Sequence, residues 1–160
     1  MKRLLIVMLI ALLFTGCRSR MKIEGTPEFK ADIQQGLALI KEHSPEQYKM
    51  VLENITRVYL DDKGFNGIHT DRSYSMDKLA HSQYAVYDEY KPYQIAAVLI
   101  HEGTHAKRIK DGTARLKEPY EEELAYNAER EFLKQFNNYA SLAALEYVEL
   151  SYQAWKKQGK

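Results

Sequence analysis

His101 and His105 have the residue type and the spacing of a metal-binding pair, because the segment from 101 to 105 runs His-Glu-Gly-Thr-His. On a helix, residues i and i+4 lie one turn apart on the same face, so both imidazoles can bind one Zn²⁺ ion. Glu102 stands beside the first histidine, where its carboxylate can take a proton from zinc-bound water and pass it to a leaving amine. The pattern therefore predicts a catalytic zinc site.

The residues before the motif favour this interpretation over a chance match. Positions 95–100 are all apolar, which predicts a buried helix that holds metal ligands rigidly. Two surface histidines beside a solvated glutamate would instead suit an exposed amphipathic helix. Gly103 lies inside the predicted helix, where glycine costs about 1 kcal/mol relative to alanine. We expect it to allow the close approach of a strand or substrate, or to relieve packing.

A catalytic zinc ion takes a third protein ligand and keeps one position open. The chain after the motif is long enough for the next helix, predicted over 119–137, to cross back over the first. Three adjacent carboxylates, Glu121, Glu122 and Glu123, begin that helix. They point about 100° apart, so only one can face the zinc ion, and the others form an acidic first turn that suits the helix dipole. Asp111 is an alternative ligand that the residues leave open.

These two helices resemble the gluzincins, the thermolysin-like zinc peptidases. The resemblance rests on the HEGTH segment and on a following pattern E-x-x-A, which Glu122 and Ala125 match in register; it covers about residues 80–136. It implies a zinc metallopeptidase whose ligands are His101, His105 and Glu122, with Glu123 as the second choice. The expected cofactor is zinc and the expected partner is a peptide or protein substrate.

The resemblance also implies two supporting features. The strand before the active helix, here 83–88, would hold an extended substrate by β-augmentation. Many relatives place an acidic or amide residue four positions after the glutamate ligand, but this chain has Tyr126. We therefore expect Glu129, two turns beyond Glu122, to support a zinc-binding histidine. Tyr126 lies one turn beyond Glu122, and we expect it to stabilise the oxyanion that forms during peptide cleavage.

Composition bounds the remaining possibilities. The chain has 160 residues, 45% hydrophobic and 28% charged, with a formal net charge of +1. The length suits one domain, and the lack of a basic excess argues against nucleic-acid binding. The single cysteine excludes an intramolecular disulfide and a four-cysteine zinc site.

Hydrophobic periodicity predicts an α+β fold that is mainly helical. A small antiparallel strand region is expected to pack on the active-site helix and on the glutamate-bearing helix after it. The predicted helices cover 27–43, 44–54, 92–110, 119–137 and 141–157. The predicted strands cover 55–60 and 83–88, and turn signals fill 61–71.

The first residues have the plan of a secretory signal peptide, with two basic residues and then an apolar run too short to span a membrane. Residues 13–17 resemble the lipobox of bacterial lipoproteins, with cleavage before Cys17 and lipid on its thiol, although Phe14 replaces the usual aliphatic residue. The predicted organisation is a signal peptide (1–16), a lipidated cysteine and tether (17–27) and a single zincin-like domain (28–160). The expected location is the bacterial cell envelope, with the outer membrane favoured in a Gram-negative host because Arg18 replaces the retention aspartate.

A second hypothesis makes the protein a non-catalytic, zinc-binding envelope lipoprotein that acts as a partner-binding module. In that case a fourth ligand, for example His69 or His81, would close the zinc site. Whether the fourth position opens onto a peptide-sized groove distinguishes the two hypotheses.

Overall fold

The computed structural model describes residues 21–84, 89–114 and 119–158. Within these ranges the chain is mainly helical and has one small four-stranded sheet, which confirms the predicted α+β class. The predicted signal peptide and Cys17 lie outside the described residues.

Helices make up most of the described chain. They are α2 (Pro27–His43), α3 (Pro45–Asn54), α4 (Lys78–Tyr84), α5 (Lys91–Lys110), α6 (Pro119–Leu133) and α7 (Tyr139–Lys157). Local signals explain several of their ends. The Thr26 side chain accepts a hydrogen bond from the Phe29 amide at the start of α2, and Asn138 caps α7 by accepting from the Ser141 amide. Gly112, at φ +67°, follows the end of α5.

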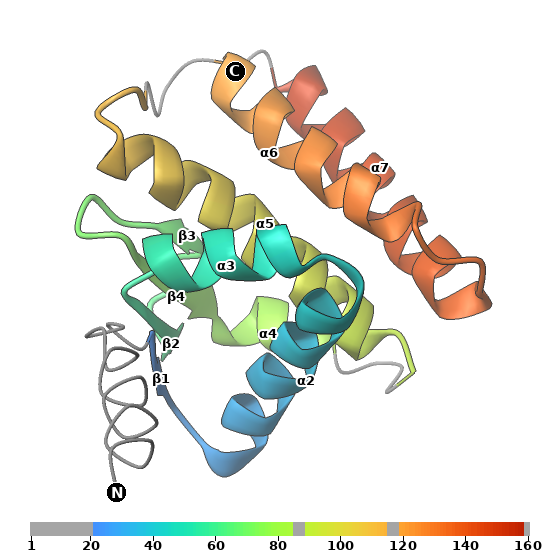
Figure 1. Cartoon of the computed structure of the whole chain (residues 1–160), viewed down its shortest axis with the longest axis horizontal. Helices are drawn as coiled ribbons and strands as arrows, with labels where there is room; N and C mark the ends of the chain where they lie inside the picture. Colours follow the sequence, from blue (N-terminus) through green and yellow to red (C-terminus); the bar gives the residue numbers. More distant parts are fainter. Residues whose placement is uncertain (1–20, 85–88, 115–118, 159–160) are drawn as a thin grey trace, which may run out of the picture.

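Helix α5 is the centre of the fold. It runs between the pair α2 and α3 on one side and the pair α6 and α7 on the other (Figure 1). Its predicted apolar run is buried, and Ile95, Leu99 and Ile100 are fully inaccessible to solvent. Phe29 from α2 and Phe132 from α6 belong to the same core. Burial on several sides therefore holds the helix that carries the histidine pair.

Gly36 allows α2 and α5 to cross at close range. A Cβ atom at this position would lie 2.6 Å from Cγ2 of Ile95 and 3.1 Å from the backbone nitrogen of Ala96. A larger residue would therefore have to displace the backbone of α5.

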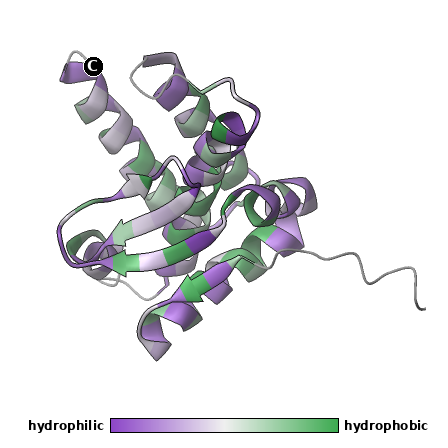
Figure 2. Cartoon of the chain, turned by 90° about the vertical axis from the view of Figure 1, so that its left-hand side faces the viewer, coloured by the Kyte–Doolittle hydropathy of each residue, from purple (hydrophilic) through white to green (hydrophobic). Residues whose placement is uncertain are grey.

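The sheet lies in front of the helices when the molecule is viewed from its strand side (Figure 2). Its strands are β1 (Lys22–Glu24), β2 (Arg57–Asp61), β3 (Gly67–Ile68) and β4 (Ser73–Asp77), in the spatial order β1-β2-β4-β3. Since β1 pairs with β2, the segment 22–24 belongs to the folded domain rather than to a tether that ends at residue 27.

The predicted antiparallel arrangement is wrong for most of the sheet. Strands β1 and β2 are parallel, and so are β2 and β4; only β3 and β4 are antiparallel. After β2 the chain turns back through Gly64, at φ +82°, and runs down the far edge as β3. It then reverses again through Arg72, at φ +64°, and β4 enters between β2 and β3. The predicted turns in 61–71 thus place β4 between β2 and β3, instead of pairing β2 directly with the next strand along the chain.

The strand predicted over 83–88 is contradicted where it can be seen, because residues 83 and 84 end helix α4. The rest of that segment lies outside the described residues. Strand β4 was not predicted, because its five residues, SYSMD, are mostly polar. Four of them are nonetheless buried, since β4 lies between two other strands and contacts α4.

Candidate metal centre

The two histidines of the motif face each other on α5. His101 and His105 are 7% and 5% exposed, and their Nε2 atoms lie 3.2 Å apart. Because the pair belongs to one rigid, buried helix, its geometry follows directly from the i, i+4 spacing.

An ion pair between α5 and α6 sets the rotation of the second helix. Arg108 donates from Nε and Nη2 to the two carboxylate oxygens of Glu121, at 2.6 and 2.7 Å. Glu121 lies in the acidic first turn of α6, as expected, but it is only 2% exposed and also joins the two helices. Ala125, one turn later, is fully buried and lets the two helices approach closely.

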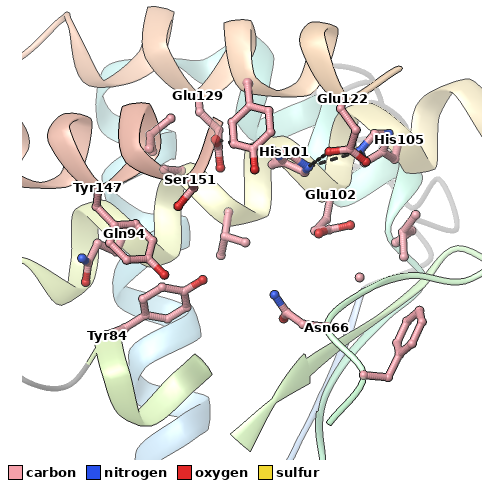
Figure 3. Close-up of a pocket in the computed structure, with 17 residues that line it drawn as sticks. Asn66, Tyr84, Gln94, His101, Glu102, His105, Glu122, Glu129, Tyr147 and Ser151 are labelled. Atoms are coloured by element: carbon pink, nitrogen blue, oxygen red, sulfur yellow. Dashed lines mark hydrogen bonds and ion pairs between the residues drawn. The ribbon is translucent and has the colours of Figure 1, made fainter. Parts of the chain in front are cut away.

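This rotation brings Glu122 to the histidines and leaves Glu123 exposed. The Glu122 Oε2 atom lies 3.3 Å from Nε2 of His101, and its Oε1 atom lies 3.5 Å from Nε2 of His105. Figure 3 shows these three side chains pointing at one another at the edge of a cavity. They are the preferred three ligands of the sequence analysis.

The donor set fits a zinc ion. Tetrahedral zinc with bonds of about 2.0–2.1 Å separates its ligand atoms by about 3.3–3.4 Å. The two Nε2 atoms lie 3.2 Å apart, and each lies close to a different oxygen of the Glu122 carboxylate, at 3.3 and 3.5 Å, so the two imidazoles and the carboxylate approach this spacing. Two imidazoles and one carboxylate also form a known catalytic zinc set with one position left open. Among the described residues, no fourth histidine, cysteine, aspartate or glutamate joins the group.

The electrostatics of the cluster favour a positive charge between its donors. Burial works to raise the pKa of Glu122, but hydrogen bonds to His101 and His105 hold that pKa well below its ordinary value. Burial works to lower the pKa of His101, but the negative charge of Glu129 and the hydrogen bond to Glu122 raise that pKa well above its ordinary value. A divalent cation supplies the positive charge that these groups attract.

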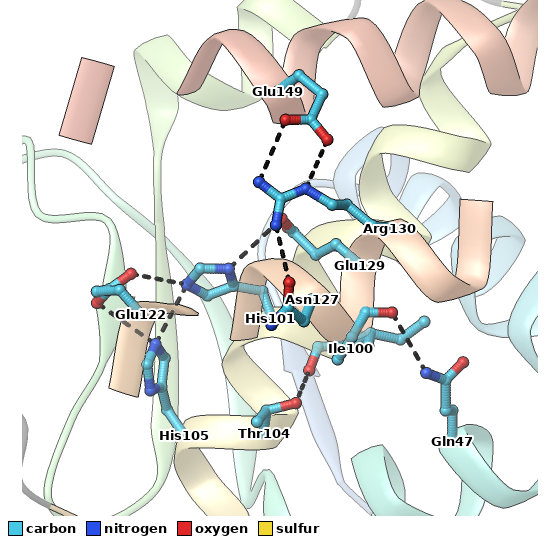
Figure 4. Close-up of polar contacts among 11 residues, drawn as sticks. Gln47, Ile100, His101, Thr104, His105, Glu122, Asn127, Glu129, Arg130 and Glu149 are labelled. Atoms are coloured by element: carbon cyan, nitrogen blue, oxygen red, sulfur yellow. Dashed lines mark hydrogen bonds and ion pairs between the residues drawn. The ribbon is translucent and has the colours of Figure 1, made fainter. Parts of the chain in front are cut away.

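Glu129 stands behind His101, two turns along α6 from Glu122. Its Oε2 atom lies 3.6 Å from Nδ1 of His101, as Figure 4 shows, and has no hydrogen-bond partner within the described chain. When Nε2 of a histidine binds a metal, its Nδ1–H needs an acceptor, and a carboxylate often fills that role. The buried oxygen of Glu129 is therefore placed where the predicted supporting carboxylate should be.

Glu102 points into the cavity below the cluster (Figure 3). It is 6% exposed, and burial raises its pKa, while the nearby His101 and His105 oppose that rise. A carboxylate in this environment can take up a proton and later release it, as a general base must.

Tyr126 lines the same cavity and packs edge-on against His101, with ring centroids 4.9 Å apart. The rings of Tyr152 and Trp155 on α7 also lie next to it, with centroids 5.3 and 6.2 Å away. Burial and the charges of Glu129 and Glu122 raise its pKa, so the hydroxyl keeps its proton and can donate a hydrogen bond.

The other candidate ligands lie elsewhere. His69 contacts Tyr59 and Ser75 in the sheet. His81 on α4 forms an ion pair with Asp32 on α2. Asp111 pairs with Lys107 at 2.6 Å on the surface. None of these three belongs to the metal group.

Gly103 serves helix packing. A Cβ atom here would lie 3.0 Å from Val51 and 3.1 Å from Sδ of Met50, both on α3. Of the two expected explanations, the relief of packing therefore accounts for this glycine, and the close neighbour is a helix rather than a strand.

The cavity beside the cluster has a volume of about 390 Å³. Residues 65–68, around edge strand β3, line one side of it. The strand that borders the cavity is therefore β3 and not the strand predicted over 83–88, although Tyr84 at the end of α4 also lines the cavity. No sequence signal marked β3, which is two residues long and is fixed by its pairing with β4.

No protein-family model, curated protein or solved structure matches this chain. Within the described residues, no helix combines the length and the apolar character needed to cross a membrane.

Proposed function

We propose that the protein is a zinc metallopeptidase of the gluzincin type. The observation that carries the proposal is the convergence of His101, His105 and Glu122 at zinc-ligand spacing, beside a cavity into which Glu102 points. Three ligands with an open side suit a catalytic zinc ion better than a structural one.

A bound zinc ion supplies Lewis-acid polarisation of the peptide carbonyl and lowers the pKa of a water molecule. Glu102 accepts the proton of the attacking water and donates it to the leaving amine. Its burial in the cavity raises the pKa of the carboxyl group, so that it holds the proton between these two steps. Tyr126 donates a hydrogen bond to the developing oxyanion.

The edge strand β3 offers a binding surface for an extended peptide. Its outer edge is not paired with a described strand, and residues around it line the cavity. The Asn66 Oδ1 atom is occupied by the Tyr74 hydroxyl and the Asp77 amide, which leaves its Nδ2 group as a donor toward the cavity. Backbone pairing with β3 would align the scissile bond with Glu102.

The test compares the wild-type protein with Glu102→Gln. We expect both proteins to bind one zinc ion per chain, as measured by elemental mass spectrometry. Cleavage of a mixed peptide library should fall by at least about 100-fold in the variant, because general-base catalysis is lost. Turnover at the wild-type rate by a zinc-loaded Glu102→Gln protein would refute the mechanism. A folded wild-type protein that binds no zinc would refute the proposed function.

We also propose that lipid on Cys17 anchors this peptidase in the bacterial envelope, on the outer membrane in a Gram-negative host. The support is the lipobox-like sequence at residues 13–17 and the near-neutral charge of the chain, which offers little electrostatic attraction to a membrane. Intact-mass analysis should find diacylglycerol on the wild-type cysteine and none on Cys17→Ser. An unmodified Cys17 in membrane-fractionated protein would contradict the proposal.

A further inference from the structure

The cavity extends away from the metal cluster into a second region, which we call the tyrosine pocket. Its polar walls come from three helices, with Tyr84 on α4, Gln94 on α5, and Tyr147 and Ser151 on α7. Figure 3 shows these four side chains around one space, on the far side of the cavity from Glu122 and His105. Ala97, Val98 and Val148 supply the apolar surface between them.

The hydrogen-bonding capacity of these four side chains is unused within the described chain. None of them forms a side-chain hydrogen bond to another described residue, and the two tyrosines contact each other only through their rings, 6.1 Å apart at 82°. Tyr84 is 6% exposed. Gln94 and Ser151 are half-buried and Tyr147 is 41% exposed, so water reaches these polar groups through the cavity. A ligand that offers matching hydrogen bonds can take the place of that water.

The charges around the pocket limit the chemistry of that ligand. Among the described residues, no lysine or arginine lines the cavity, whereas three carboxylates do, from Glu102, Glu122 and Glu129. An acidic group would be repelled and would find no counter-ion. A basic group would be drawn to these carboxylates rather than held by the four polar residues of the pocket, none of which is charged. Burial raises the pKa of Tyr84, so its hydroxyl stays protonated and can donate.

Tyr84 is held firmly in this position. Helix α4 is anchored by His81, whose Nε2 atom lies 3.0 Å from Oδ2 of Asp32 on α2 and whose ring packs against Phe29. Lys91 at the start of α5 lies 3.4 Å from the same Asp32 oxygen. This buried ion-pair cluster joins three helices and fixes the pocket before any ligand arrives.

We propose that the tyrosine pocket is a specificity site for a neutral, hydrogen-bonding side chain of the substrate, an amide or a hydroxyl, next to the bond that is cleaved. This inference rests on the proposed peptidase function and names its substrate class. Tyr84 is the main specificity-determining residue, since it is the most buried of the four polar groups. A buried hydroxyl left without a partner rejects an apolar side chain of the same shape.

The test uses zinc-loaded Glu102→Gln protein, which keeps a peptide intact, and calorimetric binding of blocked tripeptides that differ at one residue. Asparagine and leucine form a nearly isosteric pair, as do threonine and valine. We expect the asparagine peptide to bind about tenfold more tightly than the leucine peptide. Adding Tyr84→Phe should abolish this ratio, because the asparagine peptide loses a hydrogen bond and the leucine peptide no longer leaves a hydroxyl without a partner. Tyr139→Phe, on α7 but 73% exposed, is the matched control and should leave the ratio intact.

Digestion of a mixed peptide library by the wild-type protein separates the two proposals. Cleavage beside asparagine, glutamine, serine or threonine supports both, and cleavage beside apolar or charged residues overturns the pocket assignment alone. No cleavage of any peptide by a zinc-loaded protein overturns the peptidase function and the pocket assignment together. A leucine or lysine peptide that binds as tightly as the asparagine peptide also overturns the pocket assignment. If Tyr84→Phe is unstable, Ser151→Ala tests the same ratio from another helix.

Discussion

Arg108 and Glu121 form a two-pronged ion pair between α5 and α6, one residue before the glutamate that meets the histidines. The guanidinium–carboxylate distances are 2.6 and 2.7 Å, and Glu121 is almost fully buried. This pair fixes both the rotation of α6 and its height along α5. The geometry of the metal cluster thus depends on a contact in which no metal ligand takes part.

Loss of this ion pair should weaken metal binding. In Arg108→Ala, α6 loses the contact that fixes its rotation, and we expect the zinc affinity to fall about tenfold, as for other residues that orient a ligand. Competition with a chromophoric chelator measures this affinity. Lys107→Ala, which removes a surface pair with Asp111, is the control and should bind zinc normally. Equal zinc affinities in the two variants would show that the ion pair does not position Glu122.

The third ligand can be identified by comparing two adjacent glutamates. Glu122→Ala should lose most zinc binding, because this carboxylate lies 3.3 and 3.5 Å from the two histidine nitrogens. Glu123→Ala should bind zinc like the wild type, since that side chain is exposed. Zinc present at 100 times its dissociation constant should stabilise the wild-type protein by about 2.7 kcal/mol. Thermal unfolding with and without a chelator measures that gain, which should disappear only in Glu122→Ala.

Glu129 should tune metal affinity through His101. Glu129→Gln keeps the shape of the side chain but removes the charge beside Nδ1, so we expect zinc to bind 10- to 100-fold more weakly. Glu131→Gln alters an exposed glutamate on the same helix and is the matched control. The same chelator competition measures both, and an unchanged affinity in Glu129→Gln would remove Glu129 from the site.

Close helix packing predicts different costs for the two helical glycines. Gly36→Ala forces a methyl group against Ile95 and the backbone of α5, so we expect a loss of about 2 kcal/mol in the free energy of unfolding. Gly103→Ala meets the flexible end of Met50 as well as Val51 and should cost less. Urea denaturation of the metal-free proteins measures both changes. A Gly36→Ala protein at least as stable as the wild type would contradict the tight crossing of α2 and α5.

The histidine pair and its helix were predictable because their geometry is local. Two residues four apart on one helix share a face wherever the helix lies, and the apolar run 95–100 already indicates burial. The helices at 27–43 and 45–54 were equally predictable from the sequence, since proline stands at the first helical position of each. Sequence alone therefore determined the helical class and two of the three side chains of the candidate metal centre.

The rest depended on contacts between distant parts of the chain. Helix geometry alone left three adjacent glutamates open, and the preference for Glu122 came from the resemblance to the gluzincins. In the structure the Arg108–Glu121 ion pair accompanies the rotation that brings Glu122 to the histidines. Strands β2 and β4 are parallel because β4 is inserted between β2 and β3, and its mostly polar residues carry no strand signal of their own. The tyrosine pocket joins side chains that are up to 67 positions apart, Tyr84 and Ser151, and their meeting depends on how α4 and α7 pack around α5. Periodicity predicts which face of a helix is buried, but only tertiary packing decides which residues of other elements meet that face.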